Sequence, residues 1–171
     1  MHIIFFNTKG GVSKSTLCEF SSNELQRLGY TVHVDNTDQQ EHVTLLENES
    51  ADYFLYDTAG AFTADNVELL KAAADVNALI VIPMNTGVND LKELDFILAR
   101  LDEFGVKDKS RIVFTKTRKN SKALKERKDT VLERGLIPVN WVMPILDDFG
   151  EQRDTSRTRN EISAFLHEVI L

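Results

Sequence analysis

Short apolar runs alternate with longer amphipathic stretches along most of the chain. Short runs without polar interruption are typical of strands that are buried on both faces of a sheet. They predict six strands, at Ile3–Phe6, Thr31–Asp35, Tyr53–Tyr56, Ala78–Ile82, Arg111–Thr115 and Val139–Val142. Apolar residues three and four positions apart predict five helices, at Ser15–Leu28, Ala64–Ala74, Val88–Phe104, Lys119–Glu133 and Asn160–Ile170.

This alternation of strands and helices predicts an α/β fold, with a doubly wound, mostly parallel sheet flanked by helices. We expect a single domain over residues 1–171, because the sequence shows no linker, internal repeat or low-complexity segment. In such a sheet, ligands bind at the carboxyl ends of the strands. Polar residues follow most of the predicted strands, so we expect the functional site at that edge.

A loop with two glycines and two lysines follows the first predicted strand, at residues 7–16. A strand, a glycine-containing loop, a lysine, a hydroxyl residue and a helix form the layout of a phosphate-binding loop. In that layout Lys14 reaches the terminal phosphates and Ser15 binds Mg²⁺. The ordinary pattern has glycine where this chain has Thr8 and Ser13. We therefore expect Ser13 to adopt a positive φ, at a cost of about 1 kcal/mol.

Lys9, the earlier of the two loop lysines, makes the resemblance of this loop more specific. Lys-Gly-Gly-x-x-Lys-Ser-Thr, starting at Lys9, resembles the deviant Walker A loop of the ParA/MinD family of P-loop ATPases. In that family the early lysine crosses a dimer interface to the partner's nucleotide, and the resemblance gives this role to Lys9. It implies a homodimer that sandwiches two ATP molecules with Mg²⁺. The nucleotide-binding residues that it implies are Lys9, Gly10, Gly11, Val12, Ser13, Lys14, Ser15 and Thr16.

An aspartate closes the third predicted strand. Asp57 is placed to hold a Mg²⁺-bound water beside Ser15. The stretch Asp57-Thr58-Ala59-Gly60 also resembles the second switch of the family, in which the glycine senses the γ-phosphate. The resemblance gives this role to Gly60, and Thr58 is a candidate for positioning that glycine. The alternative is an aspartate that starts an ordinary turn. After the fifth strand, Thr115 and Lys116 occupy the position that contacts adenine in relatives.

The end of the second predicted strand resembles the family motif Asp-x-Asp-Pro-Gln in a degraded form. An alignment without gaps puts Asp38 on the second acid, as a further candidate on the Mg²⁺ side, and Asn36 on the first, which positions the attacking water. Asparagine can hydrogen-bond a water but cannot accept its proton, so Asn36 predicts slow or absent hydrolysis. A shift of one residue gives the role to Asp35 instead, and both assignments stay open.

Charge is unevenly distributed along the chain. Residues 107–134 contain eleven Lys or Arg and four Asp or Glu, a net charge of +7, so the remaining residues carry −14 of the total of −7. If a helix begins near Arg118, then Arg118, Lys122 and Lys125 form one stripe, with Lys119 beside it. Such a stripe can contact phosphates without reading sequence, and it is also what a solvated helix face looks like.

The composition of the chain limits the cellular compartments and the partners that we expect. Cys18 is the single cysteine, which excludes an internal disulfide and suits a reducing cytoplasm. No apolar run approaches the length of a membrane span, so we expect no membrane partner. The first residues lead directly into a predicted strand, and we expect no signal peptide.

The resemblance to the ParA/MinD family implies a cytoplasmic, nucleoid-associated ParA-like ATPase of plasmid or chromosome DNA partition. The ATP-bound dimer would bind DNA non-specifically, and a centromere-binding, ParB-type partner would stimulate hydrolysis. One alternative is a static ATP switch in conjugation or regulation with little turnover, which Asn36 and Ser13 favour. The other is a metabolic ATP-dependent ligase of the same fold, in which Lys9 has no obvious role.

Overall fold

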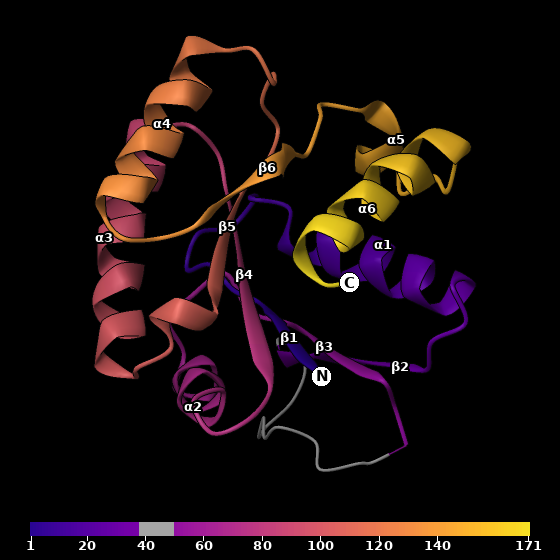
Figure 1. Cartoon of the computed structure of the whole chain (residues 1–171), viewed down its shortest axis with the longest axis horizontal. Coiled ribbons are helices and arrows are strands. Elements are labelled where there is room, and N and C mark those ends of the chain that lie inside the picture. Colours follow the sequence, from indigo (N-terminus) through magenta and orange to yellow (C-terminus); the bar gives the residue numbers. More distant parts are fainter. Residues whose placement is uncertain (38–49) are drawn as a thin grey trace.

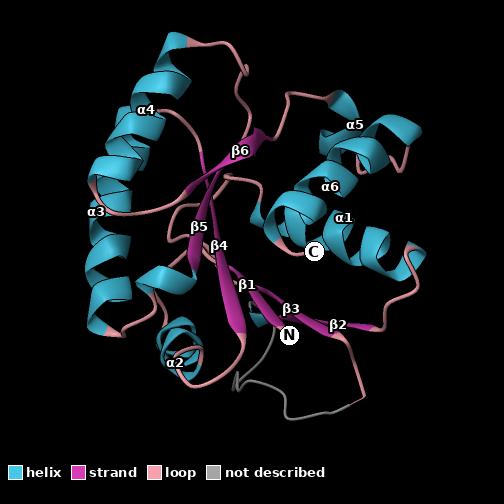
Figure 2. Cartoon of the chain, viewed as in Figure 1, coloured by secondary structure: helices cyan, strands magenta, loops and turns pink. Residues whose placement is uncertain are grey.

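The computed structural model describes residues 1–37 and 50–171, and its strands form one parallel sheet. The strands are β1 (His2–Phe5), β2 (Val32–Asn36), β3 (Tyr53–Asp57), β4 (Ala78–Met84), β5 (Ser110–Phe114) and β6 (Pro138–Val142). They lie in the order β2-β3-β1-β4-β5-β6, with every pair parallel (Figure 2). This order places the chain reversal beside β1, where ligands bind in doubly wound sheets.

Helices cover both faces of the sheet (Figure 1). One face carries α1 (Lys14–Arg27) and α6 (Ser156–Val169), and the other carries α2 (Ala64–Ala72), α3 (Val88–Glu103) and α4 (Lys122–Glu133). A 3₁₀ helix, η2 (Lys107–Lys109), precedes β5, and the short α5 (Asp147–Gly150) precedes α6. The predicted α/β fold class is therefore confirmed. None of the helices described is long and apolar enough to cross a membrane.

The two faces of the sheet bury two apolar clusters. In β1, Ile3 and Phe5 pack against the side of α1 and α6, whereas Ile4 and the following Phe6 pack on the side of α2, α3 and α4. All four side chains are fully buried. This explains why the strand sequences read as continuous apolar runs rather than as alternating patterns.

All six strands lie within two residues of their predicted positions, but two helices start elsewhere. α4 begins at Lys122, after the predicted start, because the Ser121 side chain accepts a hydrogen bond from the Leu124 N–H at 3.2 Å. α6 begins at Ser156, before the predicted start, because Thr155 and Thr158 form a capping box. α5 was not predicted.

The outer edge of β6 is covered by side chains. The backbone N–H groups of Asn140 and Trp141 both donate to the carboxylate of Glu168 on α6, at 2.8 Å for Trp141. The carbonyl of Asn140 accepts a hydrogen bond from Lys128 Nζ on α4 at 3.2 Å. These contacts satisfy groups that an edge strand otherwise presents to other chains.

Candidate functional site

The loop between β1 and α1 has the backbone that its sequence predicts. Gly11 and Ser13 both have a positive φ, 73° and 72°, so the expected strain at Ser13 is present. Ser13 occupies the N-cap of α1 without making a side-chain cap, and the first turn contains no acidic residue. The N–H groups at this helix end are therefore open to an anion, which the helix dipole also favours.

Lys14 lies within this loop. Its side chain is buried, and its Nζ donates to the carbonyl of Lys9 at 3.1 Å. The ammonium group is therefore folded back over the glycines of the loop. This is the position from which a lysine contacts phosphates bound to the backbone N–H groups.

The other lysine of the loop points to a different element. Lys9 Nζ forms an ion pair with Asp90 Oδ2 on α3 at 2.8 Å, and the Lys9 side chain is 37% exposed while that of Asp90 is 4% exposed. Thr8 also hydrogen-bonds to Glu93 on α3. The Asn7 side chain accepts from the Lys9 N–H at 2.8 Å. These contacts direct the Lys9 side chain to α3, whereas the Lys14 side chain returns to the backbone of the loop.

The segment after β3 touches the same loop. Thr58 Oγ1 donates to the carbonyl of Phe5 at 2.8 Å and is buried. A Cβ added to Gly60 would lie 3.2 Å from Gly10 Cα and 3.6 Å from Lys14 Nζ. A side chain at position 60 would therefore crowd the loop, and the close approach of Gly60 suits a sensor of what the loop holds.

Ser15, Asn36 and Asp57 line one cavity of about 380 Å³ between α1 and the strands β2 and β3. A hydroxyl and a carboxylate on one cavity are a suitable donor set for Mg²⁺, which takes few protein ligands and completes its shell with water and phosphate. No group of three His, Cys, Asp or Glu suitable for a metal occurs in residues 1–37 and 50–171. Asp38 lies outside the described residues.

The two candidates for the water-positioning residue lie on opposite faces of β2. Asn36 is the register partner of Asp57 and lines the cavity with it. Asp35 pairs with Tyr56, whose side chain belongs to the other apolar cluster. Asp35 is buried, its Oδ1 has no hydrogen-bond partner among the described residues, and burial raises its pKa while His33 opposes the rise. Asn36 is therefore the residue that the strand directs into the cavity.

Cys18 also lines this cavity, but its thiol is poorly suited to nucleophilic catalysis or metal binding. It is buried, and burial, followed by the charges of Asp57 and Glu19, raises the pKa of its thiol. A thiol that stays protonated is a poor nucleophile and a poor metal ligand. Cys18 is therefore a packed core side chain, in the same apolar cluster as Leu17 and Phe20.

A second cavity, of about 580 Å³, lies beside the loop on the other side of α1. Ser13, Thr16 and Lys116 form its loop side, and residues 143–152 form the rest, mostly with apolar side chains. The three non-glycine residues with positive φ in the described chain, Ser13, Lys116 and Gln152, all line this cavity. Such strain concentrates where function requires it.

Thr115 and Lys116 join this cavity to the loop. Thr115 Oγ1 donates to the carbonyl of Val12 at 3.1 Å, and Lys116 Nζ donates to that of Gly11 at 2.9 Å. Thr115 is buried beneath the loop, so only Lys116 reaches the cavity. Residues 143–152 were missed by the sequence prediction. Their one local signal is an apolar stretch containing Pro144 directly after a strand.

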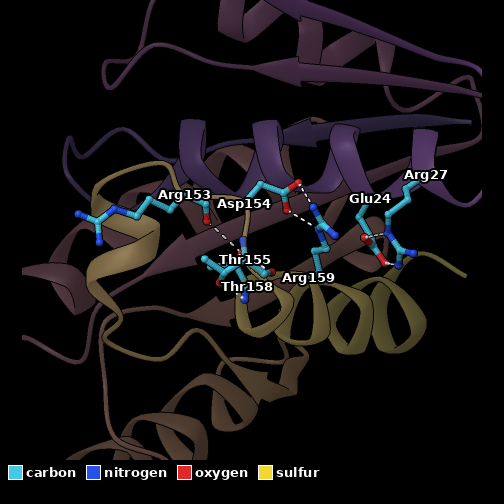
Figure 3. A network of polar contacts seen from close by, with 7 residues as sticks. All are labelled: Glu24, Arg27, Arg153, Asp154, Thr155, Thr158 and Arg159. Carbon is cyan, nitrogen blue, oxygen red and sulfur yellow. Dashed lines mark hydrogen bonds and ion pairs between the residues drawn. The ribbon is translucent and has the colours of Figure 1, made fainter.

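Polar contacts connect the segment after Gln152 to the start of α6 (Figure 3). Arg159 on α6 donates two hydrogen bonds to Asp154, at 2.8 and 2.7 Å. Thr158 Oγ1 donates to the carbonyl of Arg153 at 3.1 Å. Gln152, which lines the cavity with a positive φ, directly precedes these residues.

The basic residues around α4 divide into two groups. Three of them donate to backbone carbonyls and are part of the fold: Lys116 to Gly11, Arg127 to Thr86 and Lys128 to Asn140. The four DNA-binding candidates, Arg118, Lys119, Lys122 and Lys125, are exposed around the N-terminus of α4. The candidates are therefore a local cluster rather than a long stripe.

Comparison with known proteins identifies relatives by fold. No protein-family model and no curated protein sequence matches the chain. Solved structures do match over nearly their whole length. MinD from Aquifex aeolicus has 16% identity and a TM-score of 0.67, with 99% of this chain and 98% of that chain covered.

Two further structures broaden the comparison. A plasmid partition protein from Borrelia burgdorferi bound to AMPPNP has 12% identity and a TM-score of 0.69, with 98% and 99% covered. A cobyrinic acid a,c-diamide synthase from Mycobacterium smegmatis with ADP and magnesium has 12% identity and a TM-score of 0.66, with 97% and 94% covered. The chain therefore has the P-loop NTPase fold shared by ATPases of the ParA/MinD type, as its motifs predicted.

Proposed function

We propose that this protein is a ParA-like ATPase that binds Mg²⁺–ATP, dimerises around it, and acts in plasmid or chromosome DNA partition with slow hydrolysis. The observation that carries the proposal is the division of labour between the two loop lysines. Lys14 folds over the loop, whereas Lys9 is directed to Asp90 on α3. A site contained within one subunit does not need a second lysine directed away from the loop, as Lys9 is. A site shared by two subunits does need one.

The residues of the loop would bind the nucleotide. The N–H groups of Gly10–Thr16 and the uncapped end of α1 would hold the phosphates, and Lys14 would neutralise charge on them. Ser15 and Asp57 would hold Mg²⁺, which supplies charge neutralisation on the phosphates when bound. The cavity beside Lys116 and Gln152 would receive the base, and its apolar walls suit a flat aromatic ring.

Hydrolysis would depend on the residue that orients water. Asn36 faces the cavity beside Asp57, and its amide can hold a water without accepting its proton. Turnover is then slow and the ATP-bound state is long-lived. In that state the DNA backbone would be contacted by Arg118, Lys119, Lys122 and Lys125. A centromere-binding partner would stimulate hydrolysis and so end the ATP-bound state.

Two measurements test the proposal. Sedimentation velocity with Mg²⁺–ATP should show a dimer that is absent with Mg²⁺–ADP, lost in Lys9→Ala and kept in Lys71→Ala, a control on the exposed face of α2. Lys14→Ala should abolish ATP binding measured by calorimetry. A wild-type chain that binds no ATP would refute the proposal, and one that binds ATP but stays monomeric would refute the dimer and favour the ligase.

A second candidate function has its own observation. Asn36 in the cavity favours a static ATP switch in regulation or conjugation, because nothing else on β2 points there to accept a proton. Phosphate release distinguishes the two. Turnover indistinguishable from that of Lys14→Ala supports the static switch, and turnover that rises when DNA and a centromere-binding partner are added supports partition.

A further inference from the structure

A groove of about 850 Å³ lies between α4, the loop before it and the edge strand β6. Lys122, Lys125, Lys128 and Leu132 line it from α4 at spacings of three and four residues, so they share one face of the helix. The ten helical steps from Lys122 to Leu132 span about 15 Å along the helix. An extended peptide of about five residues has this length.

One end of the groove is basic. Lys119, Lys122 and Lys125 line this end. The described lining also contains Lys128, which donates to the carbonyl of Asn140, and one carboxylate, Asp129. Lys122 is 90% exposed and lies 3.6 Å from Glu126, its one ion-pair partner among the described residues. Asn120 and Ser121 add uncharged polar groups at the same end. The chemistry of this end calls for an anionic occupant with several separate charges.

The other end is apolar. Leu132 is 57% exposed although it lies in a concave surface, and Pro138 faces it from β6. Ile137, beside Pro138 in the chain, is 48% exposed. An occupant that fills the groove therefore gains from an apolar side chain at this end.

The combination of a basic end and an apolar end favours one class of ligand. A nucleic acid backbone would pair with the lysines but would leave Leu132 and Pro138 uncovered. Its bases would also find no aromatic or guanidinium plane to stack on, because no described residue of the lining is aromatic or an arginine. A peptide with carboxylates at one end and an apolar side chain at the other matches both.

We propose that this groove binds an acidic segment of a partner protein, with carboxylates on Lys119, Lys122 and Lys125 and an apolar side chain on Leu132. The regulatory part of the inference rests on the proposed function, because these lysines are also the proposed DNA contacts. A bound segment and DNA then exclude each other. The partner would release the protein from DNA by occupying its contact surface.

The probes are three fluorescein-labelled molecules measured by fluorescence anisotropy: a peptide of four glutamates followed by two leucines, a peptide of six glutamates, and a short DNA duplex. The glutamate–leucine peptide should bind most tightly of the two peptides and displace the duplex. Leu132→Ser should weaken it about fivefold and leave duplex binding unchanged, whereas Leu28→Ser, at the exposed end of α1, should change neither. Lys125→Ala should weaken both ligands, and Lys71→Ala neither.

The outcomes separate the inference from the proposed function. Equal binding of the two peptides, no peptide binding, or an unchanged affinity in Leu132→Ser would overturn the groove assignment even if ATP and DNA bind. Peptide binding that depends on Leu132, in a chain that binds neither ATP nor DNA, would support the groove and refute the proposed function. Thermal melting of each variant confirms that the fold is retained.

Discussion

Replacing Asp90 with asparagine should strengthen ATP-dependent dimerisation. In the structure Lys9 is paired with Asp90, and it must leave this partner to reach a nucleotide on another subunit. Asparagine is nearly isosteric and keeps the oxygen that accepts the Asn85 N–H at 3.3 Å. The substitution therefore removes the charge that holds Lys9 and little else.

The size of the effect follows from the geometry of the pair. A hydrogen bond to a charged group contributes about 1.5–3 kcal/mol. Because Lys9 is 37% exposed, solvent screening reduces this to about 1 kcal/mol. A dimer breaks two such pairs, so Asp90→Asn should favour it by about 2 kcal/mol, which is about 30-fold in the dissociation constant.

Sedimentation equilibrium with Mg²⁺–ATP measures this constant directly. Asp95→Asn is the matched control, because Asp95 lies on the same helix and pairs with Arg134 at 2.8 Å, away from the loop. The control should leave the constant unchanged. A constant for Asp90→Asn within twofold of the wild type, or one that shows a weaker dimer, would refute the idea that Asp90 restrains Lys9.

Three further predictions concern the site and its strain. Gly60→Ala should lower ATP affinity at least tenfold in calorimetry with little change in melting temperature, because the added Cβ meets the loop at 3.2 Å; an unchanged affinity would contradict the close packing. Ser13→Gly should raise the free energy of unfolding in urea by about 1 kcal/mol, since glycine accepts a φ of 72° without strain, and no gain would mean that the serine is not strained. Asp35→Asn should stabilise the protein at neutral pH, because a carboxyl whose folded pKa is raised destabilises the fold as pH rises from its ordinary value through the folded one. The gain should vanish at pH values below the ordinary pKa of aspartate, and a gain that persists there would show that charge is not its cause.

The strands and the phosphate loop were predictable because their causes are local. A buried parallel strand must be apolar throughout, and a loop that bends around phosphate needs residues such as Gly11 at a positive φ. The close packing of Gly60 on Gly10 and the shared cavity of Ser15 and Asp57 follow from adjacent strand ends. Those ends come together because β1 and β3 are parallel neighbours in the sheet.

The cavity beside Lys116 was not predictable because its walls are distant in sequence. Ser13 and Gln152 meet only because β1 and β6 lie in one sheet with a fixed strand order. The contacts that each basic side chain makes were equally unpredictable from the sequence. Nothing in the spacing around Arg127 and Lys128 shows that these two side chains bond to backbone carbonyls while Lys122 and Lys125 remain exposed.

The cover on the outer edge of β6 has a consequence for the order of folding. Its acceptor, Glu168, lies 28 and 27 residues after the two N–H donors of the strand, Asn140 and Trp141. While the chain is being synthesised, β6 can pair with β5 before α6 exists, and its outer N–H groups are then open to any other chain. The last helix is thus a built-in guard against strand-to-strand aggregation, and the interval before it docks is the period of greatest risk.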